Sequence, residues 1–146
     1  MIPAVAAAEA PRRAKLVCVD PARVSEIWPH VAHLIRRAME RGGLSEFADV
    51  ERSVAAGRAL LWLVWDGAQV LAAGVTALDL INGVKFCTIV ACGGRGLERF
   101  GGLIDGVERY ARAEGCARMR ICGRKGWARV LPDYSIKRVI LEKELN

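Results

Sequence analysis

Two dipeptides constrain the fold of this chain more than any other feature, because Asp66-Gly67 and Asn82-Gly83 each separate two apolar runs. Asp-Gly and Asn-Gly accommodate the positive φ angles that the tightest β-hairpin turns require. The apolar runs around them predict strands over 59–65, 69–80 and 85–91. The sequence therefore predicts three antiparallel strands connected as a meander.

Helical periodicity flanks this meander on both sides. Asp20 and Pro21 are typical of a helix start, and apolar residues then recur at three- and four-residue spacing to about Met39. Further helices are expected over 45–56, 97–114 and 126–131. Further strands are expected over 15–19, 117–122 and 136–145. The order β-α-α-β-β-β-α-β-α-β predicts a mixed α/β fold, with a mostly antiparallel, twisted sheet of about six strands and about four helices.

The length of 146 residues predicts one domain, over 15–146, after a flexible leader at 1–14. Hydrophobic residues make up 53% of the chain, which is enough to bury a core. No apolar run reaches the roughly 18 residues that a membrane span needs. The basic pair Arg12-Arg13 follows the apolar part of the leader, the reverse of the order in a secretory signal. We therefore expect a cytoplasmic protein without membrane contact.

Five cysteines, an odd number without a C-x-x-C pair, indicate free thiols in a reducing compartment. Cys87 and Cys92 lie in apolar strand-like runs, so they are expected to be core thiols rather than nucleophiles. His30 and His33 stand three residues apart, but no third ligand is evident. No metal site is therefore expected.

The positive charge of the chain is concentrated toward its C-terminus. The net charge is +6, and residues 93–146 alone carry 12 basic and 7 acidic side chains. This asymmetry favours an anionic partner, such as a phosphorylated cofactor, nucleic acid or an acidic protein surface. A solvated basic face explains the charge equally well.

A glycine-rich segment from Gly93 to Arg99 joins the last meander strand to the long helix expected over 97–114. Backbone N–H groups in such a turn, together with a helix N-terminus, bind anions, and Arg95 adds positive charge there. The segment is not a Walker loop, because no Gly-Lys-Ser/Thr occurs in the chain. It is not a dinucleotide fingerprint either, because Arg99 stands where the third glycine would be.

With Gly94 and Gly96 at the mouth of an amphipathic helix that is entered from an antiparallel sheet, the chain resembles the GCN5-related N-acetyltransferases (GNAT superfamily). In that family the fourth strand ends in a [Q/R]-x-x-G-x-[G/A] loop. The segment 126–134 is similar to a shortened last helix with its aromatic residue, and the element order over 15–145 matches nearly the whole family fold. The chain departs from the family at Ala91, where Gln or Arg is usual, and in the pattern of its last helix.

The resemblance implies an N-acetyltransferase that uses acetyl-CoA as co-substrate and transfers the acetyl group directly to an amine of a small molecule or protein. It implies that the following residues bind acetyl-CoA: Val90, Cys92, Gly93, Gly94, Arg95, Gly96, Leu97 and Arg99. A strand amide near Val90 would stabilise the oxyanion. Tyr134 is the candidate acid for the departing thiolate. Asp79 is the candidate base through water, although it is equally typical of a solvated strand end.

Two other functions stay open. Compact forms with a Gly-Trp in the last helix also resemble phage and prophage proteins, so a catalytically inactive structural protein, such as a virion component bound to other particle proteins, is the main alternative. A nucleic-acid binder is disfavoured, because neither a helix-turn-helix nor an aromatic-interleaved sheet face is evident. Exposed strand edges make a homodimer reasonable.

Overall fold

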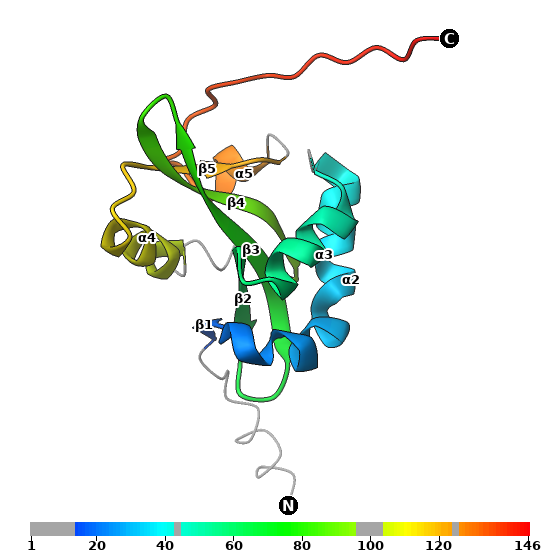
Figure 1. Cartoon of the computed structure of the whole chain (residues 1–146), viewed down its shortest axis with the longest axis vertical. Helices are drawn as coiled ribbons and strands as arrows, with labels where there is room; N and C mark the ends of the chain where they lie inside the picture. Colours follow the sequence, from blue (N-terminus) through cyan, green and yellow to red (C-terminus); the bar gives the residue numbers. More distant parts are fainter. Residues whose placement is uncertain (1–13, 43–44, 96–103, 124–125) are drawn as a thin grey trace, which may run out of the picture.

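The computed structural model describes residues 14–42, 45–95, 104–123 and 126–146 of the chain. In these residues five strands form one sheet in the spatial order β1-β2-β3-β4-β5. The strands are β1 (Lys15–Cys18), β2 (Ala59–Trp65), β3 (Val70–Ile81), β4 (Val84–Gly94) and β5 (Arg118–Ile121). The helices are the 3-10 helix η1 (Pro21–Arg23), α2 (Val24–Gly42), α3 (Phe47–Ala55), α4 (Ile104–Ala113) and α5 (Trp127–Val130). Helices α2 and α3 cover one face of the sheet and α4 lies on the other (Figure 1).

The turn between β3 and β4 has the geometry that its sequence predicts, whereas β2 and β3 are joined by the four residues 66–69, with a positive φ at Gly67 (95°) but not at Asp66. Asn82 and Gly83, between β3 and β4, adopt positive φ angles of 51° and 80°. β1 pairs antiparallel with β2, whereas β5 runs parallel to β4. The predicted mixed α/β fold with a mostly antiparallel sheet is therefore confirmed.

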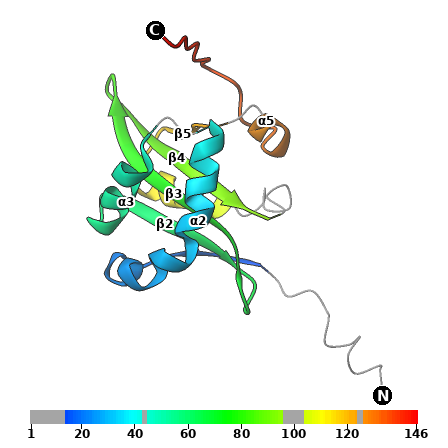
Figure 2. The ribbon, with the colours of Figure 1, turned by 90° about the vertical axis from the view of Figure 1, so that its right-hand side faces the viewer.

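The 3-10 helix η1, which continues directly into α2, begins where the sequence indicates a cap. The Asp20 carboxylate accepts a hydrogen bond from the amide of Ala22 at 2.9 Å. The buried stripe of α2 consists of side chains at helical spacing: Val24, Trp28, Val31, Ile35 and Met39. This stripe packs on sheet residues in the larger core: Leu61, Leu63, Ala73, Val75 and Ala91 (Figure 2). The indole N–H of Trp28 donates to Glu51 at 2.7 Å and so joins α2 to α3.

A smaller core lies between the sheet and α4. Trp62 of β2 packs there with Cys87 of β4 and with Val107 and Ala111 of α4. The indole nitrogen of Trp62 donates to Thr76 Oγ1 at 2.9 Å. This hydrogen bond satisfies the N–H group of the buried indole ring.

Strand β4 is longer than the sequence predicts. It continues past Ala91, so that Cys92, Gly93 and Gly94 pair with β3 instead of forming a loop. Glycine is depleted in strands, which is why the sequence indicated a strand end here. In the fold, the missing side chains let this end of β4 pass close to α2.

The strand expected over 136–145 is not formed. Residues 134–146 have no regular secondary structure and lead away from the sheet (Figure 1). If this segment were extended, Lys137 and Lys143 would interrupt one face, while Arg138 and Glu142 would interrupt the other. Neither face could then match an apolar core. The described part of the sheet therefore has five strands, fewer than expected.

Some expectations fall outside the described residues. The leader, apart from Ala14, and residues 97–103 of the third expected helix are among them. Within the described ranges, no helix has both the length and the apolar character of a membrane span.

Candidate functional site

Strands β4 and β5 separate half-way along β4. They pair in parallel from Phe86 to Ile89 on β4, opposite Arg118 to Ile121 on β5. Directly beyond β5, the amide of Cys122 donates to the carbonyl oxygen of Ile89 at 3.3 Å. From there to its end β4 pairs, in the described residues, with β3 alone. Strand β4 and the segment that follows β5 thus form a V-shaped opening at this edge of β4.

A β-bulge stands at the mouth of this opening. The register between β3 and β4 steps from Thr76 opposite Ile89 to Val75 opposite Ala91, so Val90 is the extra residue. A bulge re-aims the local backbone and is over-represented beside active sites. The amide expected to stabilise an oxyanion belongs to this part of β4.

A cavity of about 540 Å³ occupies the opening. One side of the cavity is formed by 90–94 of β4 and the adjoining Arg95, a second by the C-terminal half of α2, and a third includes Cys122 and Trp127. Its basic side chains are His33, Arg37, Arg41 and Arg95. No Asp or Glu occurs among the described residues that line it. A cavity with charge of one sign attracts ligands of the opposite sign, here anions.

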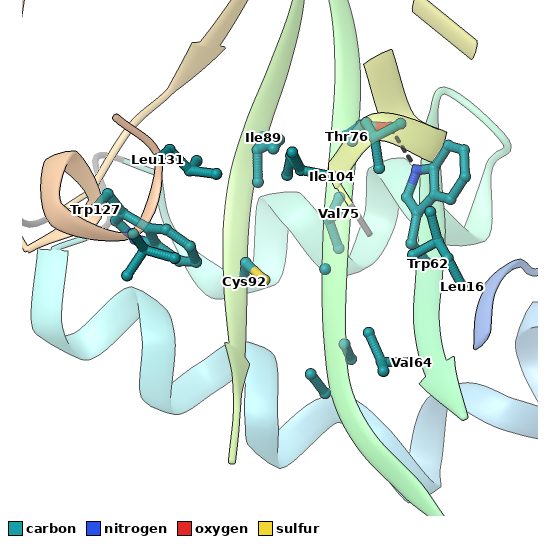
Figure 3. A pocket seen from close by; sticks show the side chains of 15 residues that line it. Leu16, Trp62, Val64, Val75, Thr76, Ile89, Cys92, Ile104, Trp127 and Leu131 are labelled. Atoms are coloured by element: carbon teal, nitrogen blue, oxygen red, sulfur yellow. Dashed lines mark hydrogen bonds between the residues drawn. The ribbon is translucent and has the colours of Figure 1, made fainter. Parts of the chain in front are cut away.

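A second cavity, of about 70 Å³, lies on the α4 face of the sheet and is almost entirely apolar. Figure 3 shows Trp62 of β2 at one side, Trp127 and Leu131 at the other, and Cys92 of β4 between them. Cys92, Trp127 and Val130 line both cavities. The opening is therefore bordered by a cationic cavity and an apolar cavity that share one wall.

The two described glycines of the expected acetyl-CoA segment have a packing role. A Cβ on Gly93 would stand 2.5 Å from the carbonyl oxygen of Leu34, and one on Gly94 would stand 2.4 Å from that of Leu71. The amide of Arg95 already donates to Leu71 at 3.0 Å. Tight packing therefore accounts for both glycines without any ligand. Three further residues expected in this segment lie outside the described residues: Gly96, Leu97 and Arg99.

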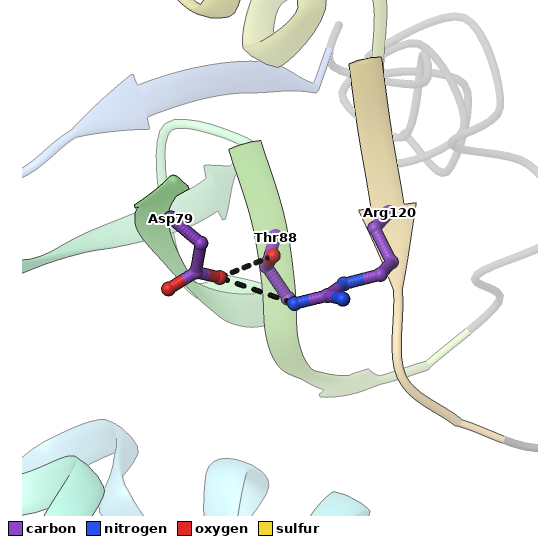
Figure 4. Close-up of polar contacts among 3 residues, drawn as sticks. All are labelled: Asp79, Thr88 and Arg120. Atoms are coloured by element: carbon purple, nitrogen blue, oxygen red, sulfur yellow. Dashed lines mark hydrogen bonds and ion pairs between the residues drawn. The ribbon is translucent and has the colours of Figure 1, made fainter. Parts of the chain in front are cut away.

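Asp79, the candidate base, belongs to a polar cluster across three strands (Figure 4). Thr88 Oγ1 of β4 donates to Asp79 Oδ2 at 2.7 Å, and Arg120 of β5 donates to the same oxygen at 3.3 Å. The Arg120 guanidinium also lies 5.2 Å from the ring centroid of Phe86. Thr88 pairs with Ala77, which packs on the α2 side, so the cluster is on that face of the sheet. None of its members lines either cavity.

Tyr134, the candidate acid, is held on the opposite side by α4. Its hydroxyl donates to Glu108 Oε2 at 2.7 Å. Burial and this hydrogen bond raise the pKa of Tyr134 well above its ordinary value. The hydroxyl therefore keeps its proton at neutral pH. The structure does not bring Tyr134 and Asp79 together.

The thiols near the opening are not activated. Burial raises the pKa of Cys92 to about 11, and burial together with Cys116 and Asp79 raises the pKa of Cys87 to about 11. Both are therefore neutral thiols at physiological pH, when a nucleophile would have to be a thiolate. In the described part of the chain, no group of three or more His, Cys, Asp or Glu side chains could hold a metal ion.

Comparison with known proteins gives no match in sequence, either to a family model or to a curated protein. Solved structures do match over most of the chain. One is an aminoglycoside acetyltransferase from an uncultured soil metagenomic sample in complex with sisomicin, with a TM-score of 0.65, 9% identity and coverage of 91% of this chain and 97% of that one.

Two further matches are similar in extent. A GNAT family acetyltransferase from Staphylococcus aureus has a TM-score of 0.61 at 9% identity and covers 90% of this chain and 98% of its own. A predicted acetyltransferase from Clostridium acetobutylicum, with acetyl-CoA, has a TM-score of 0.62 at 13% identity and covers 92% and 96%. This chain has the GNAT acetyltransferase fold. At such identities the likeness establishes the GNAT fold alone, so the chemistry must be argued from the cleft.

Sequence reasoning missed the α2 wall of the cleft. His33, Arg37 and Arg41 recur every four residues, on a side of the helix away from its buried stripe. That spacing could have predicted a row of basic side chains along one side of the helix. Only the passage of α2 over Gly93 of β4, however, places the row beside the opening.

Proposed function

We propose that this protein is an N-acetyltransferase that transfers an acetyl group directly from acetyl-CoA to an amine. The observation that carries the proposal is the opening between β4 and β5, where no strand of the described residues pairs with one edge of β4 and a cationic cavity lies alongside. Among proteins of the same fold, one was solved with acetyl-CoA and another with sisomicin.

The chemistry of the described cleft fits acetyl-CoA. An exposed strand edge offers peptide groups to an extended chain that carries amides, as in β-strand addition. Arg95, which directly follows this strand edge, suits a diphosphate. On this proposal Val90, Cys92, Gly93 and Gly94 lie along the extended part and Arg95 faces the phosphates. The sequence adds Gly96, Leu97 and Arg99 to that group.

Acetyl-CoA supplies the thioester carbon that the amine attacks, and a C–N bond forms as the C–S bond breaks. The chain contributes the bulged backbone at Val90 as the proposed oxyanion donor. Nearby positive charges disfavour an ammonium ion, so they increase the share of neutral amine. Tyr134 and, through water, Asp79 stay candidates for the acid and the base, although neither lines a described cavity.

Isothermal titration with acetyl-CoA tests the proposal. We expect saturable binding, weakened about tenfold by Arg95→Gln because one phosphate contact is lost. Arg58→Gln changes an exposed arginine outside both cavities and is the matched control. Absence of binding at millimolar acetyl-CoA would remove the proposed activity.

The second candidate is a catalytically inactive protein of the same fold with a structural role, for example in a virion. It is favoured by the contacts of Asp79 with Arg120 and of Tyr134 with Glu108, which engage both candidate catalytic groups elsewhere. Release of free thiol from acetyl-CoA in the presence of any amine excludes this candidate. The acetyltransferase proposal includes three further points. The enzyme is cytoplasmic, it forms a homodimer, and its acceptor is an amine of a small molecule or a protein.

A further inference from the structure

The C-terminal half of α2 directs a row of basic side chains toward the cleft. His33, Arg37 and Arg41 are spaced by four residues, so they lie on one side of the helix. All three are exposed and line the cavity of about 540 Å³. No described residue forms a hydrogen bond or an ion pair with any of their side chains.

Some other exposed arginines of the described chain have an acidic partner. Arg23 of η1 forms an ion pair with Glu26 in the first turn of α2, and Arg52 and Arg112 each pair with an acidic residue of their own helix. The α2 row has no such partner, and the facing wall is uncharged at Cys122 and Trp127. The positive charge in the cleft is therefore not neutralised by the described protein.

The α2 row and Arg95, the proposed site of the acetyl-CoA diphosphate, line the same cavity from different parts of the fold. Leu34 and Ala38 of α2 lie next to Gly93, so the basic row belongs to the helix that covers the α2 face of the sheet. Arg95 directly follows the last residue of β4, Gly94. Donor phosphates near Arg95 would leave the α2 row to the second substrate.

We infer that the amine acetylated in this cleft also carries an anionic group, a carboxylate or a phosphate, and that His33, Arg37 and Arg41 bind that group. The inference rests on the proposed function. Guanidinium groups suit carboxylate and phosphate oxygens because they donate two parallel hydrogen bonds. The same charges repel polycationic amines. Anionic amines are therefore the substrate class that this wall selects.

The first experiment needs no turnover. The chain has two histidines, His30 and His33, whose imidazole signals can be followed by NMR. Inorganic phosphate, added with coenzyme A at saturation, is expected to shift the His33 signal and leave that of His30, which lies outside the cavity. An unchanged His33 signal, or a phosphate effect that coenzyme A abolishes, would overturn the inference.

Variants make the same experiment specific. The double variant Arg37→Gln, Arg41→Gln is expected to abolish the phosphate effect on His33. Arg36→Gln is the matched control, because Arg36 lies on the same helix but stacks at 4.3 Å on the ring of Phe47 instead of lining the cavity. A loss of the effect in Arg36→Gln as well would indicate a general charge effect and contradict the inference.

The second experiment compares matched amines in a thiol-release assay: phosphoethanolamine with ethanolamine, glycine with glycinamide, and spermidine as a polycation. The anionic member of each pair is expected to have a kcat/KM at least about tenfold higher. The Arg37→Gln, Arg41→Gln variant should erase this preference and leave the KM for acetyl-CoA unchanged. A raised KM for acetyl-CoA would instead assign the row to the donor and overturn the inference.

Failure of the inference and failure of the proposed function give different results. If acetyl-CoA binds and neutral or polycationic amines react best, the acetyltransferase proposal stands and the anionic acceptor is wrong. If acetyl-CoA does not bind, the acetyltransferase proposal fails, and the phosphate titration of His33 alone decides whether the wall is an anion site.

Discussion

The carbonyl oxygen of Leu34 in α2 lies directly against Gly93 of β4, so closely that a Cβ on Gly93 would stand 2.5 Å from it. Helix and strand can approach this closely only where the strand has no side chain. The contact fixes where α2 crosses the sheet. It thereby brings the basic C-terminal half of α2 beside the opening between β4 and β5.

Gly93→Ala is expected to destabilise the protein by about 1 to 3 kcal/mol, because the added methyl group displaces α2 from β4. Urea unfolding followed by tryptophan fluorescence measures the loss. Gly126→Ala is the control, since a Cβ at Gly126 would meet no atom within 4 Å, and its effect should stay within about 0.5 kcal/mol. Equal stability of both variants would contradict the close contact.

Local signals made most of the fold predictable. The turn at Asn82 and Gly83 depends on two adjacent residues, and the stripe of α2 depends on spacing within one helix. The C-terminal strand was wrongly expected because isolated apolar residues were taken for a strand face. Whether a segment forms a strand depends on its pairing with a neighbouring strand, and the spacing of residues in the sequence does not show that pairing.

The site was less predictable, because it depends on contacts between distant segments. Asp79 and Arg120 are 41 residues apart, and only the β3-β4-β5 register joins them. The glycines at the end of β4 were singled out as residues that bind acetyl-CoA, whereas the structure explains Gly93 and Gly94 by packing. Their spacing alone could not distinguish a close helix from a bound anion.

Asp79→Asn tests the candidate base. The Asp79–Arg120 pair is partly exposed, so its loss should reduce the free energy of unfolding by at most about 1 kcal/mol. Because Asp79 lines neither cavity, kcat/KM is expected to stay within about threefold of the parent. Thr88→Val removes the other partner of Asp79 and is the matched variant. A fall of about a hundredfold in Asp79→Asn alone would establish Asp79 as the base.

Tyr134→Phe removes the hydroxyl that donates to Glu108. The variant is expected to lose about 1 to 2 kcal/mol of stability, because a partly buried carboxylate loses its donor. Glu108→Gln keeps an acceptor for the hydroxyl and should lose less. Thiol-release kinetics of the same two variants decide whether Tyr134 is the general acid. A large fall in kcat in Tyr134→Phe alone would support that role. A similar kcat in both variants would show that the role of Tyr134 is structural.

The stability of the protein should decrease at alkaline pH because of its buried thiols. The pKa of Cys87 is raised from 9.0 to about 11, mainly by burial. Below pH 9 both folded and unfolded states keep the proton and the full stability is present. Above that pH the unfolded state loses its proton first, so the free energy of unfolding falls by about 2 to 3 kcal/mol as the pH approaches the folded value.

Urea unfolding at several pH values between neutral and strongly alkaline measures this slope. Cys92 contributes in the same window, because its pKa is also raised to about 11. Cys87→Ala should therefore make the slope shallower without removing it. A slope identical to that of the parent would show that the Cys87 thiol titrates normally in the folded state.

Removal of residues 136–146 should leave the fold intact. The apolar side chains of this segment are exposed, with Leu141 at 92% and Val139 at 67%, and in the described sheet no strand of this segment pairs with β5. The expected change in the free energy of unfolding is within about 0.5 kcal/mol, whereas Leu131→Ala, which truncates a buried side chain, should cost about 2 to 5 kcal/mol. Size-exclusion chromatography of both variants completes the test. A large loss of stability on truncation, or the loss of a dimer, would mean that the segment pairs in solution with the open edge of β5, in its own chain or in a second copy.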